Sequence, residues 1–444
     1  MGKRAGERRK GPKCIAIVGP FSSGKTTLLE ALLARTGAIA RQNAVSSGNT
    51  VGDHSAEARA HLMSVEATFA TTEFMGESVT FVDCPGSVEF AFEVQPVLAA
   101  CDLAVVVAEP DEKKFPALQL IMRQLDEMGV PRVLFLNKID KAAAGVRETL
   151  KLLQPASSTP LLLRQIPLRK DGIVVGSIDL ALERAYIYHE HAESTVAEIP
   201  DDDRARELEA RFSMLEALAD HDDSLMEQLL EEIEPPRDAV FDDLAADLRD
   251  GSVTPVLIGS AEKGNGIMRL LKTIRHDAPD VEATRQRLGV EAGTPVLQVM
   301  KTIHTPHGGK LSVVRVLAGS VGDAAELWDA SGRTGRVSGL YRLMGKEQIK
   351  LSRANEGETA ALGKMDDIAT GATLSAAKGA VSALVELELP PPVYAMALRP
   401  RERKDEVKLS TSLQRLAEED PSLRIAQNQE TGETLLSGNG EMHL

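Results

Sequence analysis

The fold that the sequence predicts is α/β over its first 285 residues, followed by a small β-barrel and by part of an α+β, ferredoxin-like domain. In the first region, buried-strand patterns alternate with helical patterns, as they do in parallel, doubly wound sheets. From Thr294 to Leu374, short alternating strands follow one another between turn signals, which is typical of a small barrel. After the rigid linker Pro390 to Pro392, the order strand, helix, strand, strand corresponds to part of a split βαβ unit.

The elements of the first region follow from hydrophobic periodicity. Cys14 to Val18 has the pattern of a short buried strand, and Thr27 to Arg35 has that of a helix. Between them lies a loop that contains glycine. The same reasoning predicts further buried strands at Val79 to Val82, Leu103 to Val107, Arg132 to Leu136 and Pro255 to Ile258, and a helix at Phe115 to Met128.

A change of pattern between Lys141 and Thr254 predicts an insertion inside the first domain, at about residues 153–250. It contains a strand-like piece, Ile173 to Leu180, and then an acidic helical stretch. Residues 198–250 hold nineteen acids and five arginines, a net charge of −14 out of −15 for the chain. We expect either a pair of solvated helices or a protein-docking surface there, and the sequence leaves both open. Since the rest of the chain is near neutral, its other faces remain able to contact phosphate.

The remaining chain is predicted to form a barrel at residues 286–388 and a partial third domain at residues 389–444, after a first domain at residues 1–285. The third domain is expected to contain a strand, a helix and two more strands: Val393 to Leu398, Lys408 to Glu419, Leu423 to Gln427 and Thr434 to Leu436. The sequence stops before the second helix of such a unit. We therefore expect an unpaired strand edge, with local disorder or self-association near the carboxy terminus.

Bulk composition indicates a soluble, cytoplasmic protein. The chain has 444 residues, 43% of them hydrophobic, which suggests about three domains. No apolar run approaches the roughly 18 residues of a membrane span, so no membrane partner is expected. Three cysteines without ligand-like spacing argue against a disulfide framework and against a zinc site.

The loop from Gly19 to Thr26 matches the pattern G-x-x-x-x-G-K-[ST] and lies between a predicted strand and a predicted helix. The successive backbone N–H groups of Ser22, Ser23, Gly24, Lys25 and Thr26 can surround a β-phosphate. Lys25 can reach the β and γ oxygens, and the Thr26 hydroxyl can ligate Mg²⁺. We predict a phosphate-binding loop made of Gly19, Ser22, Ser23, Gly24, Lys25, Thr26 and Thr27.

A second motif, Asp83-Cys84-Pro85-Gly86, follows the strand Val79 to Val82. A carboxylate at the end of that strand can hold Mg²⁺ through water, and the Gly86 N–H can meet a γ-phosphate and respond to its loss. The pattern D-x-x-G alone is common by chance. Its position after a buried strand makes Asp83 and Gly86 candidates for the same site as the phosphate loop.

A third motif, Asn137-Lys138-Ile139-Asp140, ends the strand Arg132 to Leu136 at the sheet edge where nucleotide bases bind. The Asp140 carboxylate can accept from two adjacent N–H donors of guanine, an arrangement that adenine lacks, while Lys138 lies over the base. After the strand Pro255 to Ile258, Ser260 and Ala261 would present a backbone N–H to the guanine carbonyl. Paired hydrogen bonds of this kind allow strong discrimination between bases.

With these four segments, the chain resembles translational GTPases, and two later segments make it similar to elongation factor G. Residues 415–421 (RLAEEDP) and 438–444 (GNGEMHL) resemble stretches of that family's third domain. The likeness covers the chain almost end to end, with the last part of the family's chain missing. It implies an α/β P-loop GTPase domain with an inserted subdomain, a β-barrel and a ferredoxin-like third domain.

The resemblance also implies partners and a chemistry. It implies a factor that binds GTP or GDP with Mg²⁺ and associates with the ribosome, contacting rRNA through the barrel and stalk proteins through the insertion, with no DNA partner. Three residues depart from the family's pattern. Ser87 stands where the family usually has the histidine that orients the attacking water, Ser22 where it has an aspartate that helps hold a monovalent cation, and Ser64 where it has the threonine that ligates Mg²⁺.

Three functions follow as hypotheses. The first is a GTP-hydrolysing, ribosome-associated factor in which Ser87 and Gly86 lie at the catalytic position. The second is a GTP-dependent regulator that binds the ribosome but turns over little, because serine is too short and too weakly basic to replace imidazole. The third, an ATP-using enzyme, is opposed by Asp140.

Overall fold

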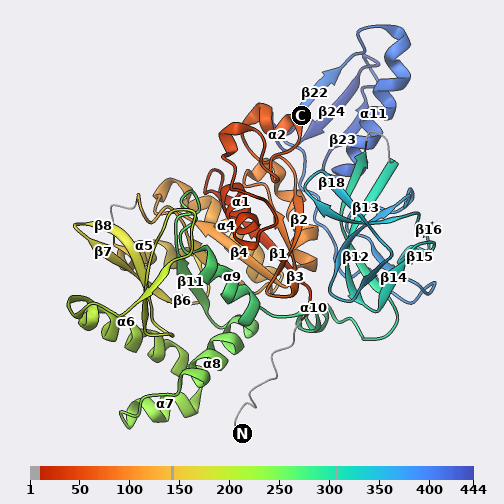
Figure 1. Cartoon of the computed structure of the whole chain (residues 1–444). Coiled ribbons are helices and arrows are strands. Elements are labelled where there is room, and N and C mark those ends of the chain that lie inside the picture. Colours follow the sequence, from red (N-terminus) through yellow and green to blue (C-terminus); the bar gives the residue numbers. More distant parts are fainter. Residues whose placement is uncertain (1–10, 142–144, 306–308) are drawn as a thin grey trace.

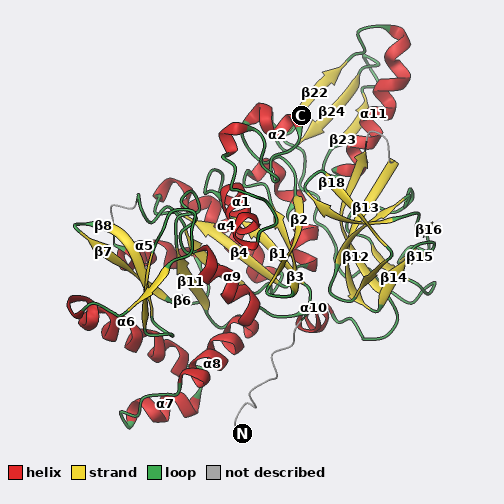
Figure 2. Ribbon diagram, in the orientation of Figure 1, coloured by secondary structure: helices red, strands yellow, loops and turns green. Residues whose placement is uncertain are grey.

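The computed structural model describes residues 11–141, 145–305 and 309–444. Figures 1 and 2 show four regions: an N-terminal part from β1 to α10, an insertion within it from β7 to α8, a barrel from β12 to β21, and a C-terminal part from β22 to β24. In these described residues no helix is both long enough and apolar enough to cross a membrane. The three cysteines are free and buried.

The N-terminal part is built on a sheet with strand order β2-β3-β1-β4-β5-β11-β6. Its strands are β1 (Lys13–Val18), β2 (Thr68–Phe74), β3 (Glu77–Asp83), β4 (Leu103–Ala108), β5 (Arg132–Leu136), β6 (Leu161–Leu163) and β11 (Thr254–Ile258). Every pairing among them is parallel except that of β2 with β3. The predicted doubly wound sheet is therefore confirmed, while β2 is an antiparallel addition that the prediction lacked.

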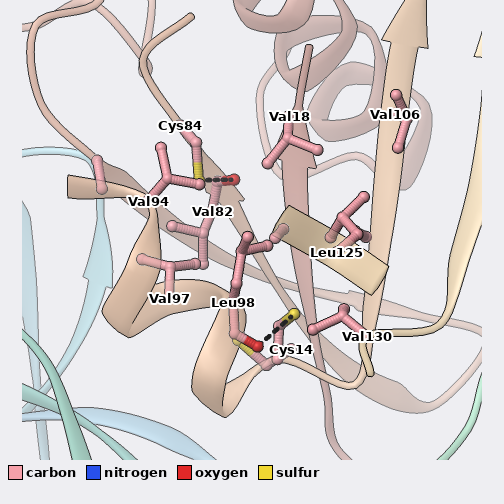
Figure 3. Packing of buried hydrophobic residues seen from close by; sticks show 14 of the residues in the cluster. Cys14, Val18, Val82, Cys84, Val94, Val97, Leu98, Val106, Leu125 and Val130 are labelled. Carbon is pink, nitrogen blue, oxygen red and sulfur yellow. Dashed lines mark hydrogen bonds between the residues drawn. The ribbon is translucent and has the colours of Figure 1, made fainter. Parts of the chain in front are cut away.

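Helices cover both faces of this sheet because successive residues of β1 point to opposite sides. Ile15 and Ile17 pack with α1 (Lys25–Thr36) and α9 (Ile267–His276). Cys14 and Val18 pack with α3 (Gln95–Ala100) and α4 (Phe115–Glu127), as Figure 3 shows for Val97, Leu98 and Leu125. The other helical elements are η1 (Val45–Ser47), α2 (Ala56–His61), η2 (Val88–Glu93), η3 (Glu112–Lys114), α5 (Val146–Leu153), η4 (Gln154–Ala156) and α10 (Val281–Leu288).

The insertion has a core of its own between an antiparallel sheet and three helices. The sheet, of order β10-β9-β8-β7, consists of β7 (Gln165–Lys170), β8 (Ile173–Asp179), β9 (Arg184–Ile187) and β10 (Thr195–Ala197). The helices are α6 (Asp201–Ala219), α7 (Asp223–Leu230) and α8 (Arg237–Asp250). The acidic block thus forms three helices, and the expectation of a pair was wrong. Since β6 pairs with β11, the separate sheet of the insertion begins only at Gln165.

The barrel encloses one apolar core that includes Leu297, Val314, Leu340 and Leu362. Its strands are β12 (Val296–Thr305), β13 (Gly309–Ala318), β14 (Ser320–Gly322), β15 (Glu326–Asp329), β16 (Thr334–Arg336), β17 (Leu340–Met344), β18 (Glu347–Leu351), β19 (Arg353–Asn355), β20 (Thr359–Gly363) and β21 (Thr373–Ser375). β17 also pairs with β2, so the sheet of the N-terminal part continues into the barrel.

The C-terminal part contains β22 (Tyr394–Leu398), η5 (Arg403–Asp405), α11 (Glu406–Glu419), β23 (Arg424–Gln427) and β24 (Thr434–Gly438). This confirms the predicted order of strand, helix, strand, strand, and β24 lies between β22 and β23. The His304 side chain of β12 contacts Glu418 of α11 at 3.1 Å, which holds the C-terminal part against the barrel.

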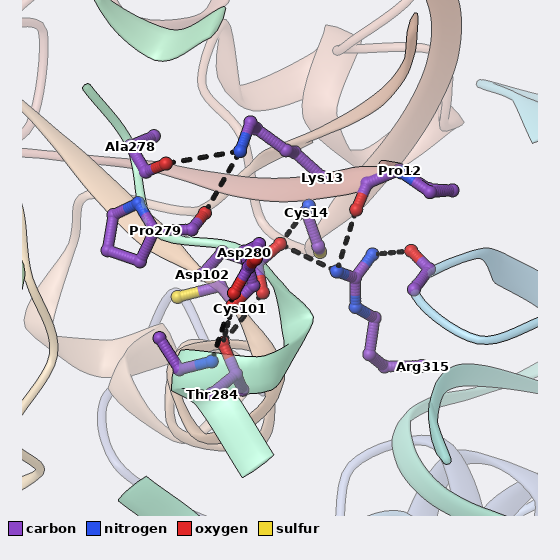
Figure 4. A network of polar contacts seen from close by, with 12 residues as sticks. Pro12, Lys13, Cys14, Cys101, Asp102, Ala278, Pro279, Asp280, Thr284 and Arg315 are labelled. Carbon is purple, nitrogen blue, oxygen red and sulfur yellow. Dashed lines mark hydrogen bonds and ion pairs between the residues drawn. The ribbon is translucent and has the colours of Figure 1, made fainter. Parts of the chain in front are cut away.

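A buried polar network joins the barrel to the N-terminal part (Figure 4). Arg315 of β13 and Asp102, just before β4, form an ion pair of 2.6 Å, and both side chains are fully buried. Asp102 also accepts from the Cys14 N–H (2.7 Å) and from the Thr284 hydroxyl (2.6 Å). A second joint is Lys301 of β12, whose ammonium lies 2.7 Å from the Glu93 carboxylate of η2. These contacts hold the barrel against the N-terminal part.

Candidate functional site

The loop from Gly19 to Thr26 has a backbone that requires glycine at two positions. Gly19 (φ 151°) approaches the Val107 carbonyl so closely that a Cβ atom would lie 2.3 Å from its oxygen. Gly24 (φ 96°) leaves a Cβ atom only 2.4 Å from the Asn137 amide nitrogen. Only glycine tolerates such contacts together with a positive φ. α1 begins at Lys25 and carries Thr26 and Thr27 in its first turn, so its N-terminal N–H groups face the loop and favour an anion.

The Lys25 side chain lies at the centre of this loop. It is buried, and its ammonium donates to the Pro20 carbonyl at 3.2 Å. Burial lowers the pKa of Lys25, and the nearby Asp83 carboxylate opposes that effect. A Cβ atom on Gly86 would lie 2.2 Å from the Lys25 ammonium, so glycine at 86 lets the second motif approach the loop. The structure therefore brings Lys25, Asp83 and Gly86 together, as predicted from two separate motifs.

Two carboxylates and two hydroxyls gather beside Lys25. The hydroxyls of Thr26 and Ser64 lie 3.0 Å apart. Asp83 is buried, and neither of its carboxylate oxygens has a hydrogen-bond partner among the described residues. The second carboxylate is Asp53, whose buried Oδ1 likewise has no partner there. Burial raises the pKa of Asp53, while Ser64, Lys25 and Thr26 lower it. Unpartnered carboxylate oxygens next to hydroxyls form a donor set that suits Mg²⁺.

The buried carboxyl group of Asp83 makes stability depend on pH. Burial raises its pKa to about 7 in the folded chain, against about 4 in an unfolded chain. Between these values the folded state binds more protons, so stability falls as the pH rises from about 4 to 7. Without nucleotide and Mg²⁺, we expect Asp83→Asn to raise the melting temperature at pH 8 and to raise it less at pH 5. Thermal unfolding followed by circular dichroism at both pH values checks this, and an equal gain at both would contradict it.

At the other end of the loop, Asn137 connects three segments. Its amide nitrogen donates to the Ser23 carbonyl and its amide oxygen accepts from the Ala261 N–H, both at 2.9 Å. Lys138 (φ 57°) turns its ammonium to the Ser22 carbonyl at 3.0 Å and to the Glu109 carboxylate at 2.6 Å. The phosphate-binding loop, the third motif and the fourth motif therefore form one continuous site along the carboxyl ends of β1, β5 and β11.

Asp140 lies half-buried at the rim of the same site. Its Oδ1 is buried without a hydrogen-bond partner among the described residues, and its Oδ2 lies 3.4 Å from the Lys263 ammonium. The fourth motif differs from expectation in one detail. The Ser260 N–H bonds to the Asn265 carbonyl at 3.1 Å and the Ala261 N–H bonds to Asn137. These N–H groups would have to leave or share their partners to reach a base, so their predicted role stays a prediction.

Ser87 directly follows the second motif and is the N-cap residue of η2. Its φ of −82° and ψ of 140° are ordinary extended values, and its hydroxyl accepts from the Glu89 N–H at 3.4 Å. The adjacent η2 also contacts the C-terminal part, since the Glu89 carboxylate accepts from the Met442 and His443 N–H groups at 3.0 and 3.1 Å. The segment that follows Gly86 is thereby tied to a distant part of the chain.

Two residues of the site escaped the sequence prediction. Asp53 lies in a stretch without clear periodicity between α1 and β2, where one acid among polar residues carries no signal. Glu109 follows β4 and holds the Lys138 ammonium. Its place at the carboxyl end of a buried strand, next to the strand that carries Asn137, was a usable signal, because polar residues at such ends gather at one edge.

Comparison with known proteins agrees with this geometry. The family model of the elongation factor Tu GTP binding domain matches residues 12–280, and that of elongation factor G, domain III, matches residues 389–444. An elongation factor G-like protein of Synechocystis sp. is 42% identical over 433 residues, which are 97% of this chain and 64% of the relative. A crystal structure from Thermus thermophilus superimposes with a TM-score of 0.88 at 32% identity and covers 97% of this chain and 64% of that one.

The chain therefore spans 64% of the length of each of these two relatives. The first family model matches the N-terminal part, before the barrel, and the second matches the C-terminal part, after the barrel. The matched domain binds guanine nucleotide, and the N-terminal part carries the corresponding motifs on the expected strands. The chain belongs to the translational GTPases with the elongation factor Tu GTP-binding domain, in the branch that is like elongation factor G.

Proposed function

We propose that this chain binds GTP and GDP with Mg²⁺, hydrolyses GTP and associates with the ribosome. The observation that carries the proposal is the hydrogen bonding of Asn137, which ties the phosphate loop at Ser23 to the fourth motif at Ala261. In this arrangement Lys25 and the N-terminus of α1 face the phosphates, while Asp140 faces the base. Membership of the family supports guanine nucleotide as the ligand, and the geometry of the site supports the roles given to these residues.

The residues present fit a magnesium ion. The hydroxyls of Thr26 and Ser64 and the carboxylates of Asp83 and Asp53 would hold it directly or through water. Both oxygens of Asp83 and Oδ1 of Asp53 are buried and lack other partners among the described residues. A bound Mg²⁺ neutralises the charge that develops on the transferred phosphate. Lys25 would neutralise the same phosphates from the loop side, and the Gly86 N–H would respond to the γ-phosphate. Ser64 keeps the hydroxyl that the family's threonine supplies.

Base selection is assigned to Asp140. Its unpartnered Oδ1 and its second oxygen can accept from two adjacent N–H groups of guanine. Asparagine at this position offers one acceptor and one donor, so one of the two hydrogen bonds is lost. We expect Asp140→Asn to lower the preference for GDP over ADP by about ten- to a hundredfold, since a hydrogen bond to a charged group contributes about 1.5–3 kcal/mol.

Isothermal titration calorimetry with GDP and ADP measures this preference. The matched control is Asp171→Asn, the same exchange in the exposed β7–β8 turn, which should leave both affinities unchanged. If the folded protein fails to bind GDP, or if Asp140→Asn keeps the wild-type preference, the proposed function is wrong.

Ribosome association is proposed from the family, with the barrel contacting rRNA and the insertion contacting stalk proteins. The insertion offers a suitable surface: Phe212 of α6 and Leu230 of α7 are 52% and 78% exposed within the acidic block. Such apolar side chains framed by acids suit a basic partner that also presents apolar residues. Co-sedimentation with ribosomes in the presence of a non-hydrolysable GTP analogue checks the association. These partners imply a cytoplasmic protein.

A second candidate is a GTP-dependent regulator that binds the ribosome and hydrolyses slowly. Ser87 favours it, because its hydroxyl is short and already accepts the Glu89 N–H. The contact of Glu89 with Met442 and His443 also favours it, since a change at Gly86 on loss of phosphate would reach the C-terminal part. In this reading the nucleotide mainly sets the conformation of the protein.

A further inference from the structure

A cavity lies between the N-terminal part and the insertion. Its volume is about 560 Å³, within the range of small-molecule sites. One wall is formed by the end of α1, with Arg35, and by α9, with Lys272. The opposite wall is the inserted sheet, where Ser177 and Tyr186 are direct neighbours on β8 and β9. None of the residues predicted to bind nucleotide lines this cavity.

The cavity carries charges of both signs that lack ion-pair partners among the described residues. Arg35, which is partly buried, and Lys272 are cationic, whereas Glu73 and Glu193 are anionic; Lys272 and both glutamates are exposed to solvent. Burial lowers the pKa of Arg35, an effect that the charge of Glu193 partly offsets. The remaining cation of the lining, Arg269, is already paired with Asp179 at 2.7 Å. A ligand that complements this set carries an anionic group and a cationic group of its own.

The remaining lining is suited to an apolar body. Tyr186, Phe74 and Met268 line the cavity together with Met75. Met75 sits at the β2–β3 turn and is 60% exposed. Aromatic rings and thioethers pack well against aromatic or branched aliphatic groups.

We propose that this cavity binds a zwitterionic molecule with a large apolar side chain, of the amino acid or short peptide class. Its carboxylate bonds to Arg35 and Lys272, its ammonium to Glu73 or Glu193, and its side chain packs on Tyr186 and Met268. The ligand supplies opposite charges to side chains that have no ion-pair partner among the described residues.

The site is connected to the base end of the proposed nucleotide site, and this part of the inference rests on that proposed function. Gly264 and Gly266 line the cavity. Gly264 belongs to the turn in which Ser260 and Asn265 exchange two backbone hydrogen bonds, and Gly266 directly follows that turn. Arg35 donates to the Gly264 carbonyl at 3.3 Å. A ligand that binds the Arg35 guanidinium would therefore change its contact with the turn that carries Ser260 and Ala261. We therefore expect ligand and GDP to change each other's affinity, by linkage by the same factor, typically about five- to 150-fold.

Calorimetry of the full chain with phenylalanine and with phenylalanyl-leucine tests the site and separates the free amino acid from the peptide. At least one of them should bind, and N-acetylphenylalanine amide, which lacks both charges, should bind at least about tenfold more weakly. Lys272→Gln and the double exchange Glu73→Gln with Glu193→Gln should weaken binding by a similar factor. Ala192→Trp, which fills the cavity without changing charge, should abolish it. The matched control is Glu190→Gln, in the same loop but outside the lining.

Absence of binding by both probes in a preparation that binds GDP would overturn the site, as would equal weakening by Glu190→Gln. Should the probe bind while GDP affinity stays the same with and without it, the connection between the sites is wrong and the cavity site stands. Should the probe bind to a chain that does not bind GDP, the proposed function fails and the cavity site again stands. The expected result is binding of the probe together with a measurable shift in GDP affinity.

Discussion

Replacing Arg315 with leucine is expected to lower the free energy of unfolding by about 3–5 kcal/mol, because it leaves the Asp102 carboxylate buried without its cation. Both side chains of the pair are fully buried at a separation of 2.6 Å. Arg315 also donates to the Pro12 carbonyl at 3.3 Å, so the exchange removes a contact between barrel and N-terminal part as well. Leucine cannot replace either contact.

The measurement is urea unfolding with two probes. The only tryptophan, Trp328, lies in β15 and reports on the barrel by fluorescence, while circular dichroism reports mainly on the helices outside it. The double exchange Arg315→Leu with Asp102→Asn should lose less stability than the sum of the single exchanges, since it removes the unpaired charge. Arg123→Leu, which breaks the exposed pair of Arg123 with Glu127, is the control and should leave the midpoint unchanged. If Arg315→Leu behaves like that control, the network does not stabilise the fold.

Local patterns account for what the sequence predicted well. The Gly19–Thr26 loop is contiguous. Its glycines at 19 and 24 are required, because a Cβ atom there would lie 2.3 and 2.4 Å from the nearest neighbouring atom. The strand at Arg132–Leu136 was predicted with the bounds that the structure gives, because both faces of β5 are buried and the whole run is apolar after its first residue. The order of strands and helices then placed Asp83 and Asn137 at one edge of the sheet.

Long-range contacts account for what the sequence did not show. Asp102 and Arg315 are 213 residues apart, and no periodicity connects them. Asp53 joins the site only because the segment before β2 folds over Thr26, where a Cβ atom on Gly52 would lie 2.7 Å from Asp83. The cavity beside Arg35 combines residues of the N-terminal part and of the insertion. Such features depend on how elements pack against one another, and the spacing of neighbouring residues does not predict this packing.

Replacing Ser87 with histidine is expected to raise ribosome-stimulated, single-turnover GTP hydrolysis by about 10²–10⁴-fold, the usual contribution of a group that orients or deprotonates the attacking nucleophile. The extended backbone at Ser87 accepts histidine without strain. Position 87 directly follows Gly86, which packs against the Lys25 ammonium, so an imidazole there is close to the proposed γ-phosphate position. GDP affinity should stay unchanged, because the hydrogen bonds of Ser87 among the described residues go to Glu89 and Phe90 and not to the loop or to the base end of the site.

The exchange also removes the hydroxyl that accepts from the Glu89 N–H at the start of η2. Ser87→Asn separates the two effects, since asparagine keeps a capping oxygen but has no imidazole. Its rate should match that of the wild type. If wild type and Ser87→His hydrolyse GTP equally fast on the ribosome, another group already orients the water, and Ser87 no longer favours a slowly hydrolysing regulator. If only Ser87→His is fast, the native serine keeps the GTP-bound state long-lived, as the second candidate function requires.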